Sequence, residues 1–166
     1  MDLDVRHAPD PVLSSPCAEA DPRDPAVISL AQAMVALMRA SPGCVGIAAP
    51  QVGHPVALFV LDVTGARRVS SCSGLVVLCS PELVRADGRE VRREGCLSVP
   101  DLTGDVGRAT SIVVRGLEPG TGAERVVAAD AFEARAFQHE MDHLQGLLFL
   151  DRVTGAHALF PRKRYL

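Results

Sequence analysis

The segment 130–144 constrains the fold of this chain more than any other, because its apolar residues predict a helix that is covered on two sides. Read at about 100° per residue, it carries one apolar stripe, a second stripe that includes two histidines, and a narrow polar remainder. We therefore expect this helix to be central and largely buried. The first stripe is Ala134, Phe137, Met141 and Leu144, the second is Phe132, Ala136, His139 and His143, and the remainder is Arg135, Gln138 and Asp142.

Both ends of this helix carry sequence signals. Asp130 is followed three residues later by Glu133, which predicts a capping pair at the start of the helix. Gly146 follows the last apolar residue, and a glycine in that place commonly ends a helix. We expect the helix to run to about Leu144.

The same helix carries the sequence Gln138-His139-Glu140-Met141-Asp142-His143. Two histidines four residues apart on a helix point the same way and can bind one metal ion, and a glutamate between them can take a proton from a water molecule. The alternative is a pair of core histidines that donate to backbone carbonyls. Because Glu140 lies between the two histidines, we favour the metal, and the pattern indicates a metallohydrolase.

The rest of the chain predicts one early helix and a series of strands. Asp24-Pro25 is typical of a helix start, and Ser41-Pro42-Gly43 of a helix end. Short β-branched runs then follow one another without intervening helices, so we expect antiparallel strands at 56–63, 75–79, 111–115 and 125–128. Pro81 is expected to end one strand, and Asp87-Gly88 to form a hairpin turn. The prediction is an α+β fold in which antiparallel strands pack around the central metal-binding helix.

Length and charge exclude several classes of protein. We expect the 166 residues to form a single catalytic domain, 1–166, which can bury about 70% of its unfolded surface. The net charge is −3 with both signs interspersed, so we expect no direct nucleic-acid binding and no membrane attachment. No signal peptide is visible, and five cysteines without CxxC spacing argue against a disulfide framework. We expect a cytoplasmic protein that binds a small molecule or peptide.

A hydrolytic metal site needs a third protein ligand, and the residues after His143 offer few. No glutamate follows it, and Phe149 stands where the longer metzincin pattern has a histidine. His157 is the only downstream imidazole. The upstream candidates are His7, His54, Cys17, Cys44, Cys72, Cys79 and Cys96. Among them Cys96 stands out, because the neighbouring Gly95 allows close backbone approach.

Three segments, in this order, resemble the signature motifs of the peptide deformylase family. They are Cys44-Val45-Gly46-Ile47-Ala48-Ala49-Pro50-Gln51, Glu94-Gly95-Cys96-Leu97-Ser98 and Gln138-His139-Glu140-Met141-Asp142-His143. The resemblance covers nearly the whole chain. It implies a metallohydrolase that acts on a formamide C–N bond and removes the formyl group from the N-terminal formylmethionine of new polypeptides. The implied partners are N-formylmethionyl peptides, with a transient contact to the ribosome as a further hypothesis.

The resemblance also implies which residues bind the metal and carry out the reaction. The implied metal ligands are Cys96, His139 and His143. Glu140 would be the general base and acid, while Gln51 and the backbone amide of Leu97 would donate hydrogen bonds to the formyl oxygen. One thiolate and two imidazoles suit zinc or ferrous iron. The family points to one divalent ion, natively Fe²⁺, with Zn²⁺, Ni²⁺ or Co²⁺ as substitutes.

The implied substrate site is a groove for an extended peptide. Its expected backbone partners are Val45, Gly46 and Gly95. Phe132 would help to wall the pocket for the methionine side chain. Pairing of this kind recognises peptide backbone without requiring particular later residues.

Three positions depart from the family pattern, because Cys44, Asp101 and Ala131 stand where glycine is usual. They motivate an alternative, a catalytically weak deformylase-like protein that binds peptides without turnover. A metalloendopeptidase is a third hypothesis, and the missing downstream ligand counts against it. The tail is expected to lack the C-terminal helix of some family members. Its basic cluster Pro161-Arg162-Lys163-Arg164 is interpreted as a solvated end, with the ribosome surface as the alternative.

Overall fold

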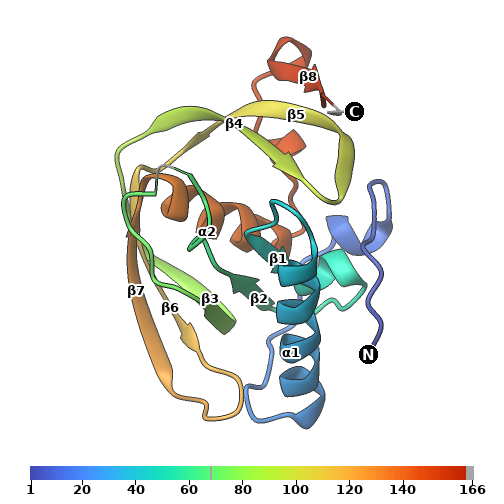
Figure 1. Cartoon of the computed structure of the whole chain (residues 1–166), viewed down its shortest axis with the longest axis vertical. Coiled ribbons are helices and arrows are strands. Elements are labelled where there is room, and N and C mark those ends of the chain that lie inside the picture. Colours follow the sequence, from blue (N-terminus) through green and yellow to red (C-terminus); the bar gives the residue numbers. More distant parts are fainter. Residues whose placement is uncertain (68, 164–166) are drawn as a thin grey trace.

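Two antiparallel sheets flank the helix that the sequence predicts to be central (Figure 1). The computed structural model describes residues 1–67 and 69–163. In these residues the larger sheet has five strands, in the order β1-β2-β3-β6-β7, and the smaller sheet has three, in the order β4-β5-β8. The strands are β1 (Gly46–Ala48), β2 (Leu58–Leu61), β3 (Val76–Asp87), β4 (Glu90–Cys96), β5 (Val99–Arg108), β6 (Ser111–Leu117), β7 (Glu124–Asp130) and β8 (Leu159–Pro161).

The helices complete this architecture. The α-helices are α1 (Pro25–Ala40) and α2 (Ala131–Leu144), and the 3₁₀ helices are η1 (Pro11–Ser14), η2 (Ala49–Val52), η3 (Phe149–Asp151) and η4 (Ala156–Ala158). All strand pairs between named strands are antiparallel. The predicted α+β fold, with antiparallel strands around the metal-binding helix, is therefore confirmed.

The early helix begins and ends where its sequence signals predict. The Asp24 carboxylate accepts a hydrogen bond from the backbone N–H of Ala26 at 2.8 Å, and Pro25 occupies the first turn. The chain leaves the helix at Ser41. One face of α1 is buried, with Met34 fully inaccessible, and it packs against β1 and β2. The stripe of apolar residues thus determines which side of α1 faces the core.

The path of β3 differs from the prediction at Pro81. Pro81 does not end the strand, which continues to Asp87 after a register shift between Cys79 and Glu82. Ser80 has φ 47 at this irregularity. A proline cannot donate to a regular ladder, and a bulge is one of the places where a strand accepts it.

The Asp87-Gly88 hairpin prediction is wrong as well. β3 pairs with β6 and β4 pairs with β5, so the turn at Gly88 (φ 70) carries the chain from the larger sheet to the smaller one. A turn is therefore present at Asp87-Gly88, but the two strands that it joins do not pair. Local sequence signals a turn and does not say which strands become neighbours.

The helix α2 is buried between the sheets, as its two apolar flanks predict. Phe137 is fully inaccessible, and its ring packs edge-to-face on Phe59 with the centroids 5.7 Å apart. The helix packs against β1, β2 and β7. It ends at Leu144, and Gly146 takes the left-handed conformation with φ 76, so the predicted C-terminus is confirmed.

The predicted capping pair at the start of α2 is wrong. Neither Asp130 nor Glu133 caps the helix, because both carboxylates bind a segment that precedes β3. Asp130 accepts from the N–H of Ser71 at 3.0 Å, and Glu133, fully buried, accepts from Ser71 Oγ, Ser73 N and Ser73 Oγ. Ala131 has φ 47, a conformation that favours glycine, which explains why glycine is usual in this position.

The described tail after α2 contains η3, η4 and β8 and no further α-helix. Arg164, part of the basic cluster in the sequence, lies outside the described residues. Among the described helices, none is both long and apolar enough to span a membrane.

We predict that Glu133→Ala lowers the free energy of unfolding by about 2–3 kcal/mol, because two serine side chains and one backbone N–H lose their buried acceptor. Urea denaturation of both proteins measures this difference. The matched control is Glu82→Ala, which removes an exposed ion pair with Arg115 and should cost less than about 1 kcal/mol. Equal losses in the two variants would contradict the anchoring role of Glu133.

Candidate metal centre

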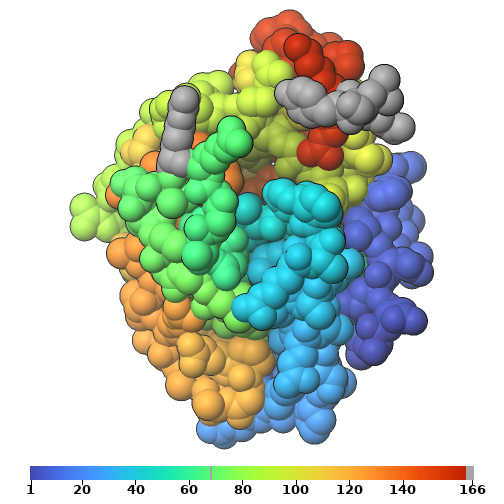
Figure 2. Space-filling view, in the orientation of Figure 1, coloured from blue at the N-terminus to red at the C-terminus, as the bar shows by residue number. Residues whose placement is uncertain are grey.

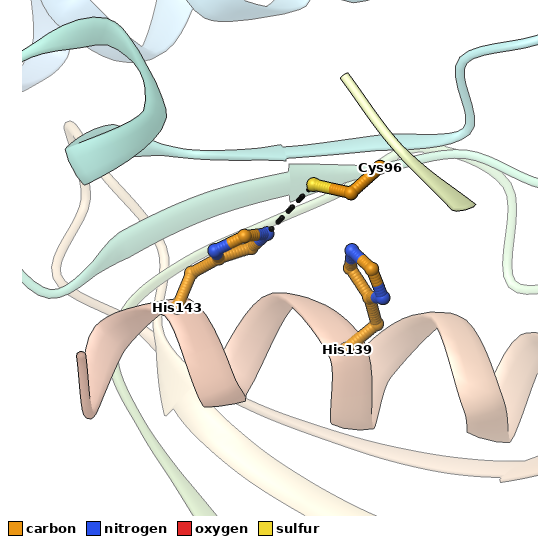
Figure 3. A group of neighbouring side chains, drawn as sticks. All are labelled: Cys96, His139 and His143. Atoms are coloured by element: carbon orange, nitrogen blue, oxygen red, sulfur yellow. Dashed lines mark hydrogen bonds between the residues drawn. The ribbon is translucent and has the colours of Figure 1, made fainter. Parts of the chain in front are cut away.

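Three potential metal ligands converge between β4 and α2 (Figure 3). Cys96 is the last residue of β4, and His139 and His143 lie one turn apart on α2. One ligand atom of each residue lies within 4.8 Å of the others, and Cys96 Sγ is 3.4 Å from His143 Nε2. Of the upstream candidates for a third ligand, the structure places Cys96 beside the histidine pair.

The chemistry of these donors fits a divalent metal. His139 Nδ1 is 2.9 Å from Glu94 Oε1, and donation to this carboxylate leaves Nε2 as the free lone pair for a metal. His143 presents its other ring nitrogen, Nε2, toward Cys96, so this lone pair is available to the same metal. The buried Glu140 Oε2 has no hydrogen-bond partner among the described residues, and such an atom is costly unless a water molecule or substrate satisfies it. A thiolate and two imidazoles are a donor set that zinc and ferrous iron accept.

Burial changes the protonation of the groups around this site. Burial raises the pKa of Glu140 to about 7, although the nearby His139 lowers it, so this carboxylate can both take and release a proton near neutral pH. Burial also lowers the pKa of His143 well below its ordinary value, which favours the neutral imidazole that a metal requires.

A buried network of ion pairs holds the His139 ring through its Nδ1 atom. Glu94, whose side chain is 8% exposed, accepts two hydrogen bonds of 2.9 Å from Arg108 at the end of β5. Burial alone would raise the pKa of Glu94, but hydrogen bonds from Arg108 and His139 lower it to about 2. Arg108 also donates to Asp142, which in turn accepts two hydrogen bonds from Arg152. The carboxylate of Glu94 is therefore charged and held in place.

This network supplies a residue that the sequence pattern did not reveal. Asp142, on the narrow polar remainder of the helix, is only 7% exposed, because Arg108 and Arg152 satisfy its charge. Arg108 itself is 4% exposed and has no local motif. Only its contacts across β4, β5 and α2 reveal its role.

Gln51 is held directly at the candidate ligand Cys96. It lies in η2, its Oε1 accepts from Ala48 N–H at 3.0 Å, and its Nε2 lies 3.3 Å from Cys96 Sγ and 3.2 Å from Ser98 Oγ. The side-chain amide is thereby oriented with its N–H₂ group toward the site. Ser98 is fully buried and was not predicted to take part.

A cavity of about 440 Å³ opens beside these residues. It lies on the face shown in Figure 2, between the cyan and yellow-green segments. Its lining includes every predicted catalytic and substrate-binding residue, namely Val45, Gly46, Gln51, Gly95, Leu97, Phe132 and Glu140. Cys96 and His139 also line it, whereas His143 is 1% exposed and is not part of its lining. The three sequence segments are thus brought to one cavity.

Two residues of the first signature segment shape the cavity wall. A methyl group on Gly46 would lie 2.7 Å from Glu140 Oε1, so the absence of a side chain there makes room for the Glu140 carboxylate. Cys44 also lines the cavity, and its thiol donates to Gly46 O at 3.2 Å. Burial raises the pKa of Cys44 to about 11, so this side chain is a thiol.

The interpretation of the C-terminal basic cluster as a solvated end holds for Pro161 and Lys163, which are exposed, and fails for Arg162. Arg162 is half-buried and lines the cavity, together with Arg93 and Arg135. The sequence carried no signal for this position, because it results from the pairing of β8 with β5.

The comparisons with known proteins agree with this geometry. Residues 3–158 match the family model described as polypeptide deformylase. A peptide deformylase of Halothermothrix orenii is 44% identical over 152 residues, which are 92% of this chain and 94% of that protein. The peptide deformylase structure from Thermotoga maritima is 33% identical with a TM-score of 0.83, covering 93% of this chain and 99% of that one.

A further solved structure carries a bound peptide. The peptide deformylase of Acinetobacter baumannii, solved with Met-Ala-Ser bound, is 32% identical with a TM-score of 0.84, and the match covers 92% of this chain and 99% of that one. The strand order, the three converging ligands and the similarity over nearly the whole length lead to one conclusion: this chain belongs to the peptide deformylase family.

Proposed function

We propose that this protein is a metal-dependent peptide deformylase, which hydrolyses the formyl group from the N-terminal formylmethionine of newly synthesised polypeptides. The observation that carries the proposal is the placement of Cys96, His139 and His143 within 4.8 Å of one another, beside the buried Glu140 and at one cavity. Family membership supplies the reaction class. The substrates are N-formylmethionyl peptides.

The substrate backbone would lie between two strand edges. β1 is the edge strand of the larger sheet and β4 is the edge strand of the smaller one, and residues of both line the cavity. An extended peptide can add to such edges through main-chain hydrogen bonds. We assign Val45, Gly46 and Gly95 as its backbone partners and Phe132 as a wall of the methionine pocket. The tripeptide bound to the Acinetobacter baumannii relative supports a peptide ligand of this kind.

The residues of the chain have separate tasks in the reaction. A divalent metal held by Cys96, His139 and His143 supplies Lewis acidity, which lowers the pKa of water at the site. The Glu140 carboxylate takes the proton of the attacking water and returns it to the leaving amine. Gln51 Nε2 and the N–H of Leu97 donate to the formyl oxygen as negative charge develops on it. The hydrogen bond from Ala48 N–H to Gln51 Oε1 supports this orientation of the amide.

We further propose that the native metal is Fe²⁺, with Zn²⁺, Ni²⁺ or Co²⁺ able to replace it. The mixed sulfur and nitrogen donor set suits all four ions, and the preference for Fe²⁺ comes from the family resemblance. The whole chain, 1–166, would act as one catalytic domain, in line with a family match over residues 3–158. We place the protein in the cytoplasm, with transient contact to the ribosome. The five cysteines, all free, are consistent with a reducing compartment.

Anaerobically prepared protein should release formate from formyl-Met-Ala-Ser in proportion to its metal content, because the metal is needed for hydrolysis. Formate and bound metal are measured in the same sample. Tight peptide binding without formate would favour the alternative, a binding protein, which the Cys44 side chain in the cavity wall motivates. Cleavage of internal peptide bonds would instead indicate an endopeptidase.

We predict that Glu140→Gln lowers kcat by about 10²- to 10⁴-fold, because the amide cannot accept and return the proton. Metal content should stay the same, since Glu140 is not among the proposed ligands. Steady-state formate release and metal analysis check both statements. Glu124→Gln, an exposed change on β7, is the matched control. A near-normal rate in Glu140→Gln would refute the assigned role.

We predict that Glu94→Ala weakens metal binding by about 10- to 100-fold, because the His139 ring loses the acceptor that orients it. Competition with a chelator measures the affinity. Glu90→Ala is the matched control on the same strand, since the partners of Glu90 in the described part of the chain are Arg92 and Arg135 near the surface. If Glu94→Ala binds metal as tightly as Glu90→Ala does, Glu94 does not support the site.

A further inference from the structure

Three arginines line the cavity and have no task in the reaction described above: Arg93, Arg135 and Arg162. The acidic residues of the same lining are Glu94 and Glu140. Both are buried, and the charge of Glu94 is matched by Arg108 and His139. The lining of the cavity is therefore more positive than the protein as a whole, whose net charge is −3.

The three arginines differ in whether they already form an ion pair with a neighbouring carboxylate. Arg93 Nε lies 2.9 Å from Asp105, and Arg135 Nη1 lies 3.5 Å from Glu90. Within residues 1–67 and 69–163, the Arg162 guanidinium forms no ion pair. Among these residues, no carboxylate competes with a substrate for it.

The smaller sheet holds Arg162 against Gly95 in the lining of the cavity. Pro161 pairs with Leu102 in the β5–β8 ladder, and the Arg162 N–H donates to Asp101 O at 2.9 Å. A methyl group added to Gly95 would overlap the Arg162 guanidinium, so the arginine covers the side of Gly95 that has no side chain. This contact is one residue from Cys96.

Arg93 lies on the same part of the sheet. It is two residues before Gly95 on β4, so the two positions share a face of the strand. Its guanidinium lies over the Phe160 ring, 3.6 Å from the centroid, and Phe160 pairs with Thr103, which also pairs with Gly95. Arg93 and Arg162 thus lie on the same face of the smaller sheet, in the lining of the cavity.

We propose that Arg162, assisted by Arg93, selects substrates with an acidic side chain at one of the two positions that follow formylmethionine, residue 2 or residue 3 of the peptide. This inference rests on the proposed function. A peptide that pairs with β4 and has its formyl group near Cys96 passes Gly95, and at about 3.3 Å per residue its next residues come within reach of the guanidinium. Arginine binds a carboxylate with two parallel hydrogen bonds, which glutamine or lysine in the substrate cannot accept.

The test compares amidated peptides of the form formyl-Met-Ala-X-Ala and formyl-Met-X-Ala-Ala, with X as Glu, Gln or Lys. Amidation removes the terminal carboxylate, which would otherwise compete for the arginine. We expect the wild-type protein to favour Glu over Gln by about threefold to fivefold in kcat/KM in at least one series, through a lower KM. The preference should shrink between about 0.02 M and about 0.5 M salt, because the ions screen an exposed charge.

Variants of Arg162 locate the effect. Arg162→Gln should bring the Glu-to-Gln ratio close to one, and Arg162→Glu should favour Lys. The ratio is taken within each variant, so differences in metal content or folding cancel. The control is Arg115→Gln, which removes one positive charge from the larger sheet and should leave the ratio as in the wild type.

The outcomes separate this inference from the function on which it rests. A wild-type ratio of one in both peptide series, or an unchanged ratio in Arg162→Gln, would overturn the selection by Arg162 while deformylation stands. Release of no formate from any peptide would overturn both.

Discussion

The carboxylate of Glu94 connects three parts of the chain that are distant in sequence, and the metal centre depends on this connection. It lies on β4, accepts two hydrogen bonds from Arg108 on β5, and faces His139 on α2. A buried carboxylate without partners costs on the order of several kcal/mol. Because its partners meet only in this arrangement, the contact fixes how α2 sits against the smaller sheet and how the His139 ring is turned.

The two edges of the groove follow a common physical rule. Gly46 on β1 and Gly95 on β4 both lack a side chain where another residue needs the space, Glu140 in one case and Arg162 in the other. The first makes room for the proposed general base beside the metal ligands. The second admits the charged side chain of the residue that directly follows β8. Because each glycine has no side chain, a functional side chain can lie next to the strand backbone that would bind the substrate.

Much of the fold and of the candidate site could be predicted because their signals are local or lie in short motifs. The helix that carries His139 and His143 has a clear period, and Gly146 marks its end. The resemblance to peptide deformylases predicts Cys96 as a ligand from the sequence alone, and the structure places its sulfur beside the histidines. Sheet membership was harder, since the turn at Gly88 joins strands of different sheets and no local pattern encodes that choice.

The donor types, their spacing and the apolar faces that bury α2 can be predicted from the sequence alone, because these depend on period and residue chemistry. How the buried charges are matched follows only from the folded arrangement of the chain. Asp142 is buried because two arginines reach it, and Asp130 and Glu133 bind a preceding loop instead of capping their helix. Arg162 lines the groove because β8 pairs with β5. The physical reason is the same in each case: the free energy of a charged side chain depends on partners that folding brings from elsewhere in the chain.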